Sequence, residues 1–159
     1  MYYINLMIKL SKMTDYAVVC LGTLARRPGY SMSATELSKE TGLALYTVQK
    51  LLKLLVSKSD FIKAYRGAFG GYILNRNSSK ISVVEIIEAL DGPITLTSCV
   101  NKSESFCEAT DICFLGGKWN KINEIIRKSL NDITLEDLLN YENPILIDDN
   151  KDTLIDRIN

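Results

Sequence analysis

The sequence predicts a mainly α-helical protein with a small β-hairpin. Stretches with apolar side chains at helical spacing recur along the chain, and serine or threonine caps precede several of them. One pair of short extended segments is joined by a glycine-rich turn. With 159 residues, of which 47% are hydrophobic and 24% charged, the chain suits one compact domain plus an oligomerisation element.

The first half of the chain predicts three helices in succession. The first covers 14–27 and ends at Pro28. A capping box formed by Ser33 and Glu36 opens a short second helix. The third helix runs over 45–58. It is predicted to bury one face, with Val48, Leu51, Leu52 and Leu55, and to expose another, with Tyr46, Thr47, Gln49, Lys50 and Lys53.

Two extended segments follow, at 61–66 and 72–76, separated by a turn that contains three glycines. We expect these glycines to relieve the steric cost of positive φ, so that the segments form a β-hairpin. Three helices followed by such a hairpin is the order of a winged helix-turn-helix, in which the second helix of the motif enters the major groove of DNA. The sequence therefore predicts a winged helix-turn-helix domain over 1–80.

The charge of this first half agrees with a polyanionic partner. Residues 1–80 carry twelve Lys and Arg against four Asp and Glu, a net charge of +8, and the rest of the chain carries the opposite net charge. The alternative is that the basic and acidic halves form two solvated faces of one protein and that the charges do not indicate a polyanionic partner. Within the basic half, the residues predicted to contact double-stranded DNA are Tyr46, Thr47, Gln49, Lys50 and Lys53 on the third helix and Arg66 and Phe69 at the hairpin tip.

Specific roles follow from the chemistry of these side chains. Gln49 can form paired hydrogen bonds with adenine, and Lys50 can donate to guanine or to phosphate. Tyr46 and Thr47 can reach a thymine methyl group or a phosphate, while the hairpin tip follows the backbone or the minor groove. The alternative is that these are ordinary solvated side chains of a small helical domain.

The second half predicts a further set of elements. Ser82 and Glu85 cap a helix, and Thr134 and Asp137 cap a short one. The segments are a connecting helix within 81–98, a cysteine-bearing loop at 99–116, a long helix with a short capping helix within 117–140, and an acidic tail at 141–159. The long helix carries an apolar seam of Leu115, Trp119, Ile122 and Ile126. We expect this seam to pair with its copy in a homodimer, although it would also fit against the chain's own domain.

Three of the four cysteines, Cys99, Cys107 and Cys113, lie in one polar stretch, whereas Cys20 lies among apolar residues and is predicted to be part of the core. Such grouping indicates metal or redox chemistry. Zinc sites usually contain a Cys-x2-Cys pair, which is absent here, while thiolates also suit iron-sulfur clusters. Three cysteines leave the usual set of four ligands one short, and the chain has no histidine. Candidates for the fourth ligand are Glu104, Glu108 and Asp111, a residue of a partner subunit, or an exogenous thiol.

Six fragments in order are similar to one family. They are LSKMTDYAVVCLGTLA, ATELSKETGLALYTVQKLLKLL, RGAFGGYIL, ISVVEIIEALDGPI, the three cysteines followed by a Trp, and ITLEDLL. Together they resemble the IscR-type regulators, and within them the branch that controls the SUF iron-sulfur assembly system. The resemblance implies a homodimer with a long dimerisation helix and a cluster, of the [2Fe-2S] type, bound in the loop before that helix. Some relatives place a His where this chain has Gly116, but the SUF-type relatives also lack it. The resemblance also implies that translation begins at Met7.

We therefore predict a transcription regulator that senses an iron-sulfur cluster and controls SUF-type genes. It is not expected to be an enzyme, since it contains no His, no P-loop and no Gly-x-Ser-x-Gly. Without a signal peptide or an apolar run of about 20 residues, it is expected in the cytoplasm and not in a membrane. Two alternatives stay open. One is a cluster-free thiol sensor in which Cys107 and Cys113 form a disulfide, and the other is a redox enzyme or cluster carrier whose basic half docks an acidic partner.

Overall fold

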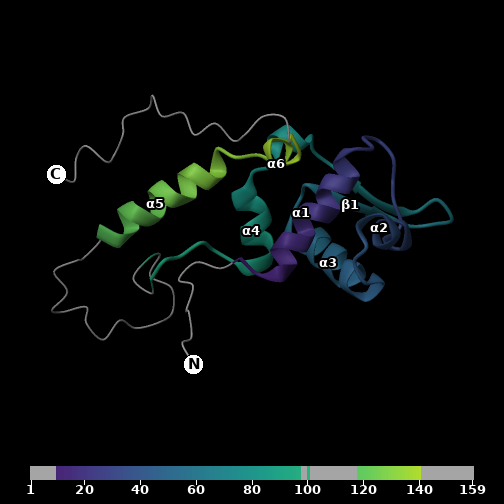
Figure 1. Cartoon of the computed structure of the whole chain (residues 1–159), viewed down its shortest axis with the longest axis horizontal. Helices are drawn as coiled ribbons and strands as arrows, with labels where there is room; N and C mark the ends of the chain where they lie inside the picture. The colour runs from purple at the N-terminus through teal and green to yellow at the C-terminus, as the bar shows by residue number, and fades with distance from the viewer. Residues whose placement is uncertain (1–9, 98–99, 101–117, 141–159) are drawn as a thin grey trace.

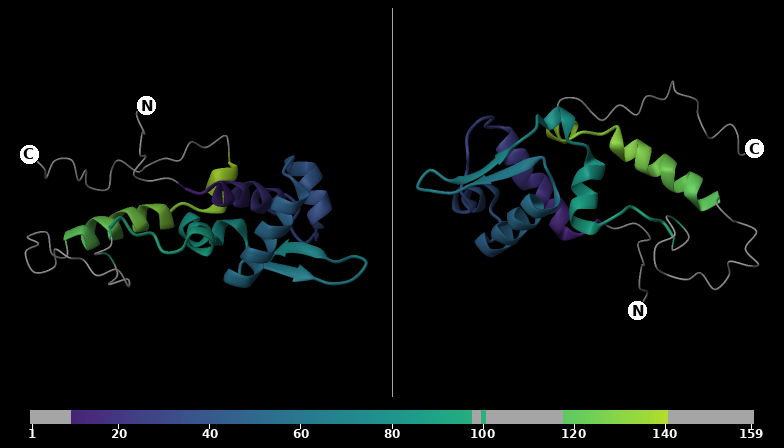
Figure 2. Two further views of the ribbon diagram at one scale, coloured as in Figure 1. Left: turned by 90° about the horizontal axis from the view of Figure 1, so that it is seen from below. Right: turned by 180° about the vertical axis from the view of Figure 1, so that it is seen from behind.

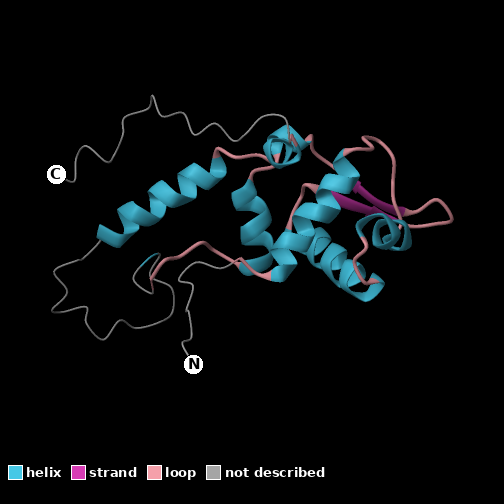
Figure 3. Ribbon diagram, in the orientation of Figure 1, coloured by secondary structure: helices cyan, strands magenta, loops and turns pink. Residues whose placement is uncertain are grey.

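The computed structural model describes residues 10–97, 100 and 118–140, and this part of the chain has the predicted fold class (Figure 1). Helices predominate, and the one two-stranded sheet is a small antiparallel hairpin (Figure 3). The elements are α1 (Lys12–Ala25), α2 (Ala34–Thr41), α3 (Leu45–Lys58), β1 (Ile62–Tyr65), β2 (Gly71–Leu74), the 3-10 helix η1 (Ser78–Lys80), α4 (Val83–Asp91), α5 (Lys118–Asn131) and α6 (Leu135–Leu139).

Helix caps account for several of these boundaries. The predicted capping boxes at Ser33 and Ser82 are both present, each with a glutamate three residues later. Helix α1 begins two residues earlier than the sequence pattern indicated, because the Ser11 hydroxyl accepts a hydrogen bond from the backbone N–H of Thr14. The carboxylate of Asp91, at the end of α4, also accepts hydrogen bonds from the Ser11 N–H at 3.1 Å and the Thr14 hydroxyl at 2.9 Å.

One hydrophobic core contains residues from helices that precede the hairpin in the sequence and from helices that follow it. It contains Leu21 of α1 and Leu51 of α3, and also Ile86 of α4 and Leu135 of α6, all fully buried. Gly22 of α1 allows α6 to approach closely, since a Cβ atom at this position would lie 2.6 Å from Leu139 Cδ2. The end of the described chain therefore packs into the same core as its first helix.

The hairpin is fixed to the helical body at its base. β1 and β2 pair in antiparallel register from Ile62 opposite Leu74 to Tyr65 opposite Gly71. Met32, just before α2, exchanges backbone hydrogen bonds of 3.0 and 2.8 Å with Tyr72 of β2. The base of the hairpin is thereby tied to the connection between α1 and α2.

The glycines of the turn serve two different purposes. Gly67 has the expected positive φ, at 113°, but Gly70 and Gly71 are not among the positive-φ glycines. A Cβ atom on Gly70 would lie 2.5 Å from the carbonyl oxygen of Tyr65, and one on Gly71 would lie 2.6 Å from that of Met32. The expectation that all three relieve positive φ was therefore right only for Gly67, and close backbone approach explains the other two.

Helix α5 lies beside α4, away from the hairpin (Figure 2). Its polar side chains hold it there. Asn123 donates a hydrogen bond to the Ile94 carbonyl at 2.8 Å and accepts one from the Leu96 N–H at 3.0 Å. Arg127 forms a two-pronged ion pair with Glu88 of α4, at 2.8 and 2.9 Å. No helix in the described residues is both long enough and apolar enough to cross a membrane.

Candidate nucleic-acid interface

Helix α3 has one apolar face and one polar face, as the sequence predicted. Val48, Leu51, Leu52 and Leu55 are fully buried. Tyr46, Gln49 and Lys53 are spaced by three and four residues, and Lys50 is three residues from Lys53, which places these four side chains together on the other face. All four are exposed, while Thr47 is half-buried at the edge of the face. The structure thus leaves a continuous polar surface along α3.

The beginning of α3 differs from that of most other helices. Ser11, Ser33, Ser82 and Thr134 provide side-chain caps for α1, α2, α4 and α6. Ala44 provides no such hydrogen bond for α3. The first backbone N–H groups of α3 therefore have no side-chain partner at their cap, and N–H groups at a helix start favour anions such as phosphate.

The hairpin adds further exposed residues. Arg66 is exposed in its turn, and Phe69 is 95% exposed. Lys63 and Tyr65 are also exposed, although neither is among the residues predicted from the sequence to contact DNA. Their spacing of two residues within the strand, opposite to the buried Ile62, was the signal that would have found them. The wing therefore offers more cationic and aromatic surface than predicted.

The cations of this surface are available to a ligand. Within the described part of the chain, none of Lys50, Lys53, Lys63 and Arg66 forms an ion pair. Two arginines elsewhere are already paired: Arg27 with Glu40 at 2.7 Å, and Arg127 with Glu88 at 2.8 Å. The unpaired positive charge on α3 and the wing is suited to phosphate groups.

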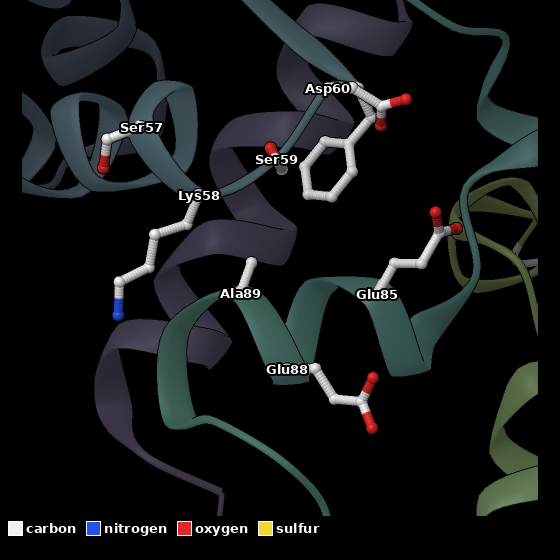
Figure 4. A pocket seen from close by; sticks show the side chains of 8 residues that line it. Ser57, Lys58, Ser59, Asp60, Glu85, Glu88 and Ala89 are labelled. Carbon is white, nitrogen blue, oxygen red and sulfur yellow. The ribbon is translucent and has the colours of Figure 1, made fainter.

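An acidic recess lies between the end of α3 and α4 (Figure 4). Figure 4 shows the carboxylates of Asp60, Glu85 and Glu88 on one side and the Lys58 ammonium group on the other. Arg76 bridges Asp60 and Glu85 at 2.9 and 2.6 Å. Burial opposes ionisation of Glu85, but the hydrogen bonds from Arg76 and from the Ser82 backbone outweigh it and lower the pKa of the carboxyl group. The three carboxylates of the recess are thus paired with arginines of the same chain, Asp60 and Glu85 with Arg76 and Glu88 with Arg127.

The predicted apolar seam of α5 is only partly covered. Trp119 and Ile126 are half-buried, and Ile122 is 43% exposed. Ile125 is also exposed, while the buried residue of this helix is the polar Asn123. Helix α5 thus leaves apolar side chains exposed in the described part of the chain.

The predicted cluster ligands lie outside the described residues. These are Cys99, Cys107 and Cys113, the carboxylate candidates Glu104, Glu108 and Asp111, and also Leu115 of the seam. Cys20 is described, and it is buried on α1 as predicted. Burial raises the pKa of its thiol to about 11, which keeps it protonated and unreactive.

Three helices are followed by a β-hairpin, and the third helix, α3, buries its apolar face and exposes its polar face. This is the arrangement of the winged-helix class of DNA-binding proteins. Comparison with known proteins then identifies the family. The chain matches Rrf2, described as an iron-dependent transcriptional regulator, over residues 10–141, and it belongs to this family. It is accordingly a DNA-binding transcriptional regulator and not an enzyme.

Individual relatives agree with this assignment. The HTH-type transcriptional regulator IscR of Sodalis glossinidius is 30% identical over 146 residues, which cover 91% of this chain and 87% of the relative. The structure of CymR, the global cysteine regulator of B. subtilis, has a TM-score of 0.64 at 26% identity and covers 86% of this chain and 99% of that one. The structure of IscR from T. potens has a TM-score of 0.56 at 28% identity, with 83% and 86% covered.

Proposed function

We propose that α3 reads the major groove of double-stranded DNA and that the wing contacts the adjacent backbone or minor groove. The observation that carries this proposal is the exposed polar face of α3, whose cations form no ion pair with any other described residue. Gln49, Lys50, Tyr46, Thr47 and Lys53 are the groove-facing residues, and Arg66 and Phe69 act from the wing.

Salt dependence tests the phosphate contacts. The logarithm of the association constant is expected to fall with the logarithm of salt concentration by about 0.9 for each phosphate contacted. Arg66→Ala is expected to weaken binding and to reduce this slope by about 1. Lys121→Ala, which removes a positive charge from the exposed surface of α5, is the matched control. Equal slopes for wild type and Arg66→Ala would contradict the role of the wing.

Sequence preference tests the reading of bases. Gln49→Ala is expected to change which duplex is preferred, at a cost of about 1 to 3 kcal/mol for the best site. Lys53→Ala is expected to weaken all duplexes alike, because a phosphate contact carries no sequence information. A uniform loss of affinity for Gln49→Ala across a library of duplexes would remove Gln49 from the base-reading set.

We further propose that Cys99, Cys107 and Cys113 hold an iron-sulfur cluster of the [2Fe-2S] type. Three cysteine thiolates in one polar stretch are a donor set that fits such a cluster, and the chain belongs to a family described as iron-dependent. Glu108 or Asp111 is the preferred fourth ligand, because both lie between the second and third cysteines in the sequence. When bound, the cluster supplies a redox-active group whose presence depends on iron and sulfide.

The proposed output is control of SUF-type assembly genes by a homodimer whose DNA affinity differs with and without the cluster. Helix α5 begins at Lys118, soon after the last cysteine in the sequence. It is tied to α4 through Glu88, and α4 is tied through Glu85 to Arg76, just beyond β2. These contacts offer a physical route from the cysteine segment to the wing, and a coupling free energy requires contacts that differ between the two states.

Anaerobic spectroscopy tests the cluster. Protein supplied with iron and sulfide is expected to absorb visible light, and Cys99→Ala, Cys107→Ala and Cys113→Ala are each expected to abolish this absorption. Cys20→Ala is the control and should leave the spectrum unchanged, because its thiol is buried in the core. The DNA affinity of the three variants, measured beside the spectrum, reports the coupling.

The fourth ligand is tested by Glu108→Ala and Asp111→Ala. A shorter cluster lifetime in one of them would assign the ligand, and an unchanged spectrum and lifetime in both would point to the partner subunit or to a small thiol. A wild-type protein that stays colourless would contradict the cluster. It would favour the thiol sensor, in which oxidation joins Cys107 and Cys113 in a disulfide.

A further inference from the structure

Phe69 lies in the turn between β1 and β2 and is 95% exposed. It is the most exposed of the large hydrophobic residues in the described part of the chain. The turn projects beyond the helices at the end of the molecule away from α5 (Figures 1 and 2). An aromatic ring at this place gains almost no packing from its own subunit, and its apolar surface is available to a binding partner.

The backbone around Phe69 is held in place. The Ser31 hydroxyl donates a hydrogen bond to the Phe69 carbonyl at 3.1 Å, and the Gly70 N–H donates to the Gly67 carbonyl at 3.0 Å. Gly67 occupies a positive φ, and a Cβ atom on Gly70 would clash with the carbonyl of Tyr65 at 2.5 Å. The ring is therefore presented from a preorganised turn, which reduces the entropy lost when it binds.

The neighbouring side chains define the chemistry of the partner. Arg66 lies in the same turn and Lys63 in the adjoining strand β1, and both are exposed cations without ion pairs among the described residues. A matching partner offers negative charge next to flat apolar surface. The minor groove of DNA has phosphates at its rim and base faces that become accessible when a step opens, and phenylalanine is one of the residues that enter such steps.

We infer that Phe69 is an apolar wedge that enters the minor groove and partly unstacks one base step beside the site read by α3. This inference rests on the proposed DNA-binding function and deepens it. Pyrimidine–purine steps unstack and kink most easily, so Phe69 selects for such a step at a position that α3 does not touch. It is a specificity-determining residue that acts through the deformability of DNA.

The experiment begins with a duplex selected by the full-length wild-type protein from a library with a randomised core. 2-Aminopurine, which fluoresces more strongly when unstacked, is placed at each pyrimidine–purine step in turn, and a dye pair at the duplex ends reports bending. Wild type and Phe69→Leu are expected to raise the fluorescence at one step and to bend the duplex. Phe69→Ala is expected to do neither and to bind about tenfold or more weakly.

Controls separate the wedge from the rest of the interface. Phe69→Ala should leave the salt slope and the thermal unfolding midpoint unchanged, because it removes no charge and no core packing. Ala68→Ser, in the same turn, should behave as wild type. A Phe69→Ala protein that bends and unstacks DNA like wild type overturns the wedge, as does one that changes only the association state of the protein.

Measurements on the wild-type protein alone distinguish failure of the wedge from failure of the proposed DNA-reading function. Steeply salt-dependent binding to a selected duplex that stays straight and stacked overturns the wedge and leaves the proposed DNA-reading role in place. A wild type that selects no duplex overturns both.

Discussion

Helices α3 and α5 are both 14 residues long, and they place their apolar side chains in opposite environments. Leu51 and Leu52 of α3 are fully buried in the core. Ile122 and Ile125 of α5 are exposed to 43% and 36%, and the buried residue of α5 is Asn123. Helix α3 is therefore held by apolar contacts and presents polar groups outward, while α5 is held by polar contacts and presents apolar groups outward.

This difference indicates what each helix is prepared to bind. The exposed side of α3 carries amide, hydroxyl and ammonium groups, which suit phosphates and base edges. The exposed apolar stripe of α5 gains free energy only by leaving water, and a second copy of the same helix offers a matching surface. We therefore propose that α3 provides the surface for DNA and α5 the surface for assembly.

The largest expected effect is on the α5 surface. Ile122→Glu would place an unpaired charge in the proposed dimer contact, which costs several kcal/mol, and it is expected to give monomers. Specific binding to half-sites about 34 Å apart should be lost with the dimer. Sedimentation velocity measures the association state, with Lys121→Glu on the same helix as the control. An Ile122→Glu protein that sediments as an intact dimer would refute the role of the seam.

A core substitution on α3 should act differently. Leu51→Ala is expected to lower the free energy of unfolding by about 2 to 5 kcal/mol, because it removes buried methyl groups and leaves a cavity. The loss should be seen in urea denaturation whatever the effect on assembly. Tyr46→Ala, on the exposed face of the same helix, should change stability by less than about 0.5 kcal/mol. Equal losses for the two variants would mean that α3 is not divided into faces as the structure shows.

The polar attachment of α5 predicts a smaller loss. Asn123→Ala leaves the Leu96 N–H and the Ile94 carbonyl without their partner, which should cost about 1 to 3 kcal/mol. Hydrogen exchange at the Leu96 amide should become faster. Asn120→Ala provides the control, since Asn120 is exposed on the same helix. Unchanged exchange at Leu96 in Asn123→Ala would contradict the polar attachment.

The features that the sequence predicted well are local ones. The capping boxes at Ser33 and Ser82 involve residues three apart, and the buried face of α3 follows from the spacing of its leucines. Both depend on geometry within one or two helical turns, so the pattern of residues was sufficient. The exposed positions of Gln49 and Lys50 in the candidate interface followed for the same reason.

The features that the sequence analysis missed depend on contacts between distant residues. Gly71 is required by the approach of Met32, and Gly22 by Leu139, so no local pattern revealed either need. Asn123 was not recognised as a buried residue, because its hydrogen-bond partners are the backbone groups of Ile94 and Leu96 in another segment. Such requirements appear only once the chain is folded.

The smallest expected effect concerns the Glu88–Arg127 ion pair, the second polar attachment of α5. The hydrogen bond from Arg127 lowers the pKa of Glu88 below its ordinary value of 4.5, despite partial burial, so the ionised carboxylate stabilises the folded protein. That contribution is fully present above pH 4.5 and is lost as the pH falls through the lowered pKa. Because both side chains of the pair remain partly in contact with solvent, it should amount to about 1 kcal/mol or less.

Unfolding by urea at a series of pH values measures this contribution. Wild type should exceed Glu88→Gln in stability by a constant amount at neutral pH, and the difference should shrink once the solution is acidified below pH 4.5. The control is Glu124→Gln. Glu124 is exposed and forms only a long ion pair of 4.0 Å with Lys121, so this substitution should leave the stability almost unchanged at every pH. A gap between wild type and Glu88→Gln that stays the same on acidification would show that Glu88 holds α5 by packing, and the contrast between the two helices would then rest on Asn123 alone.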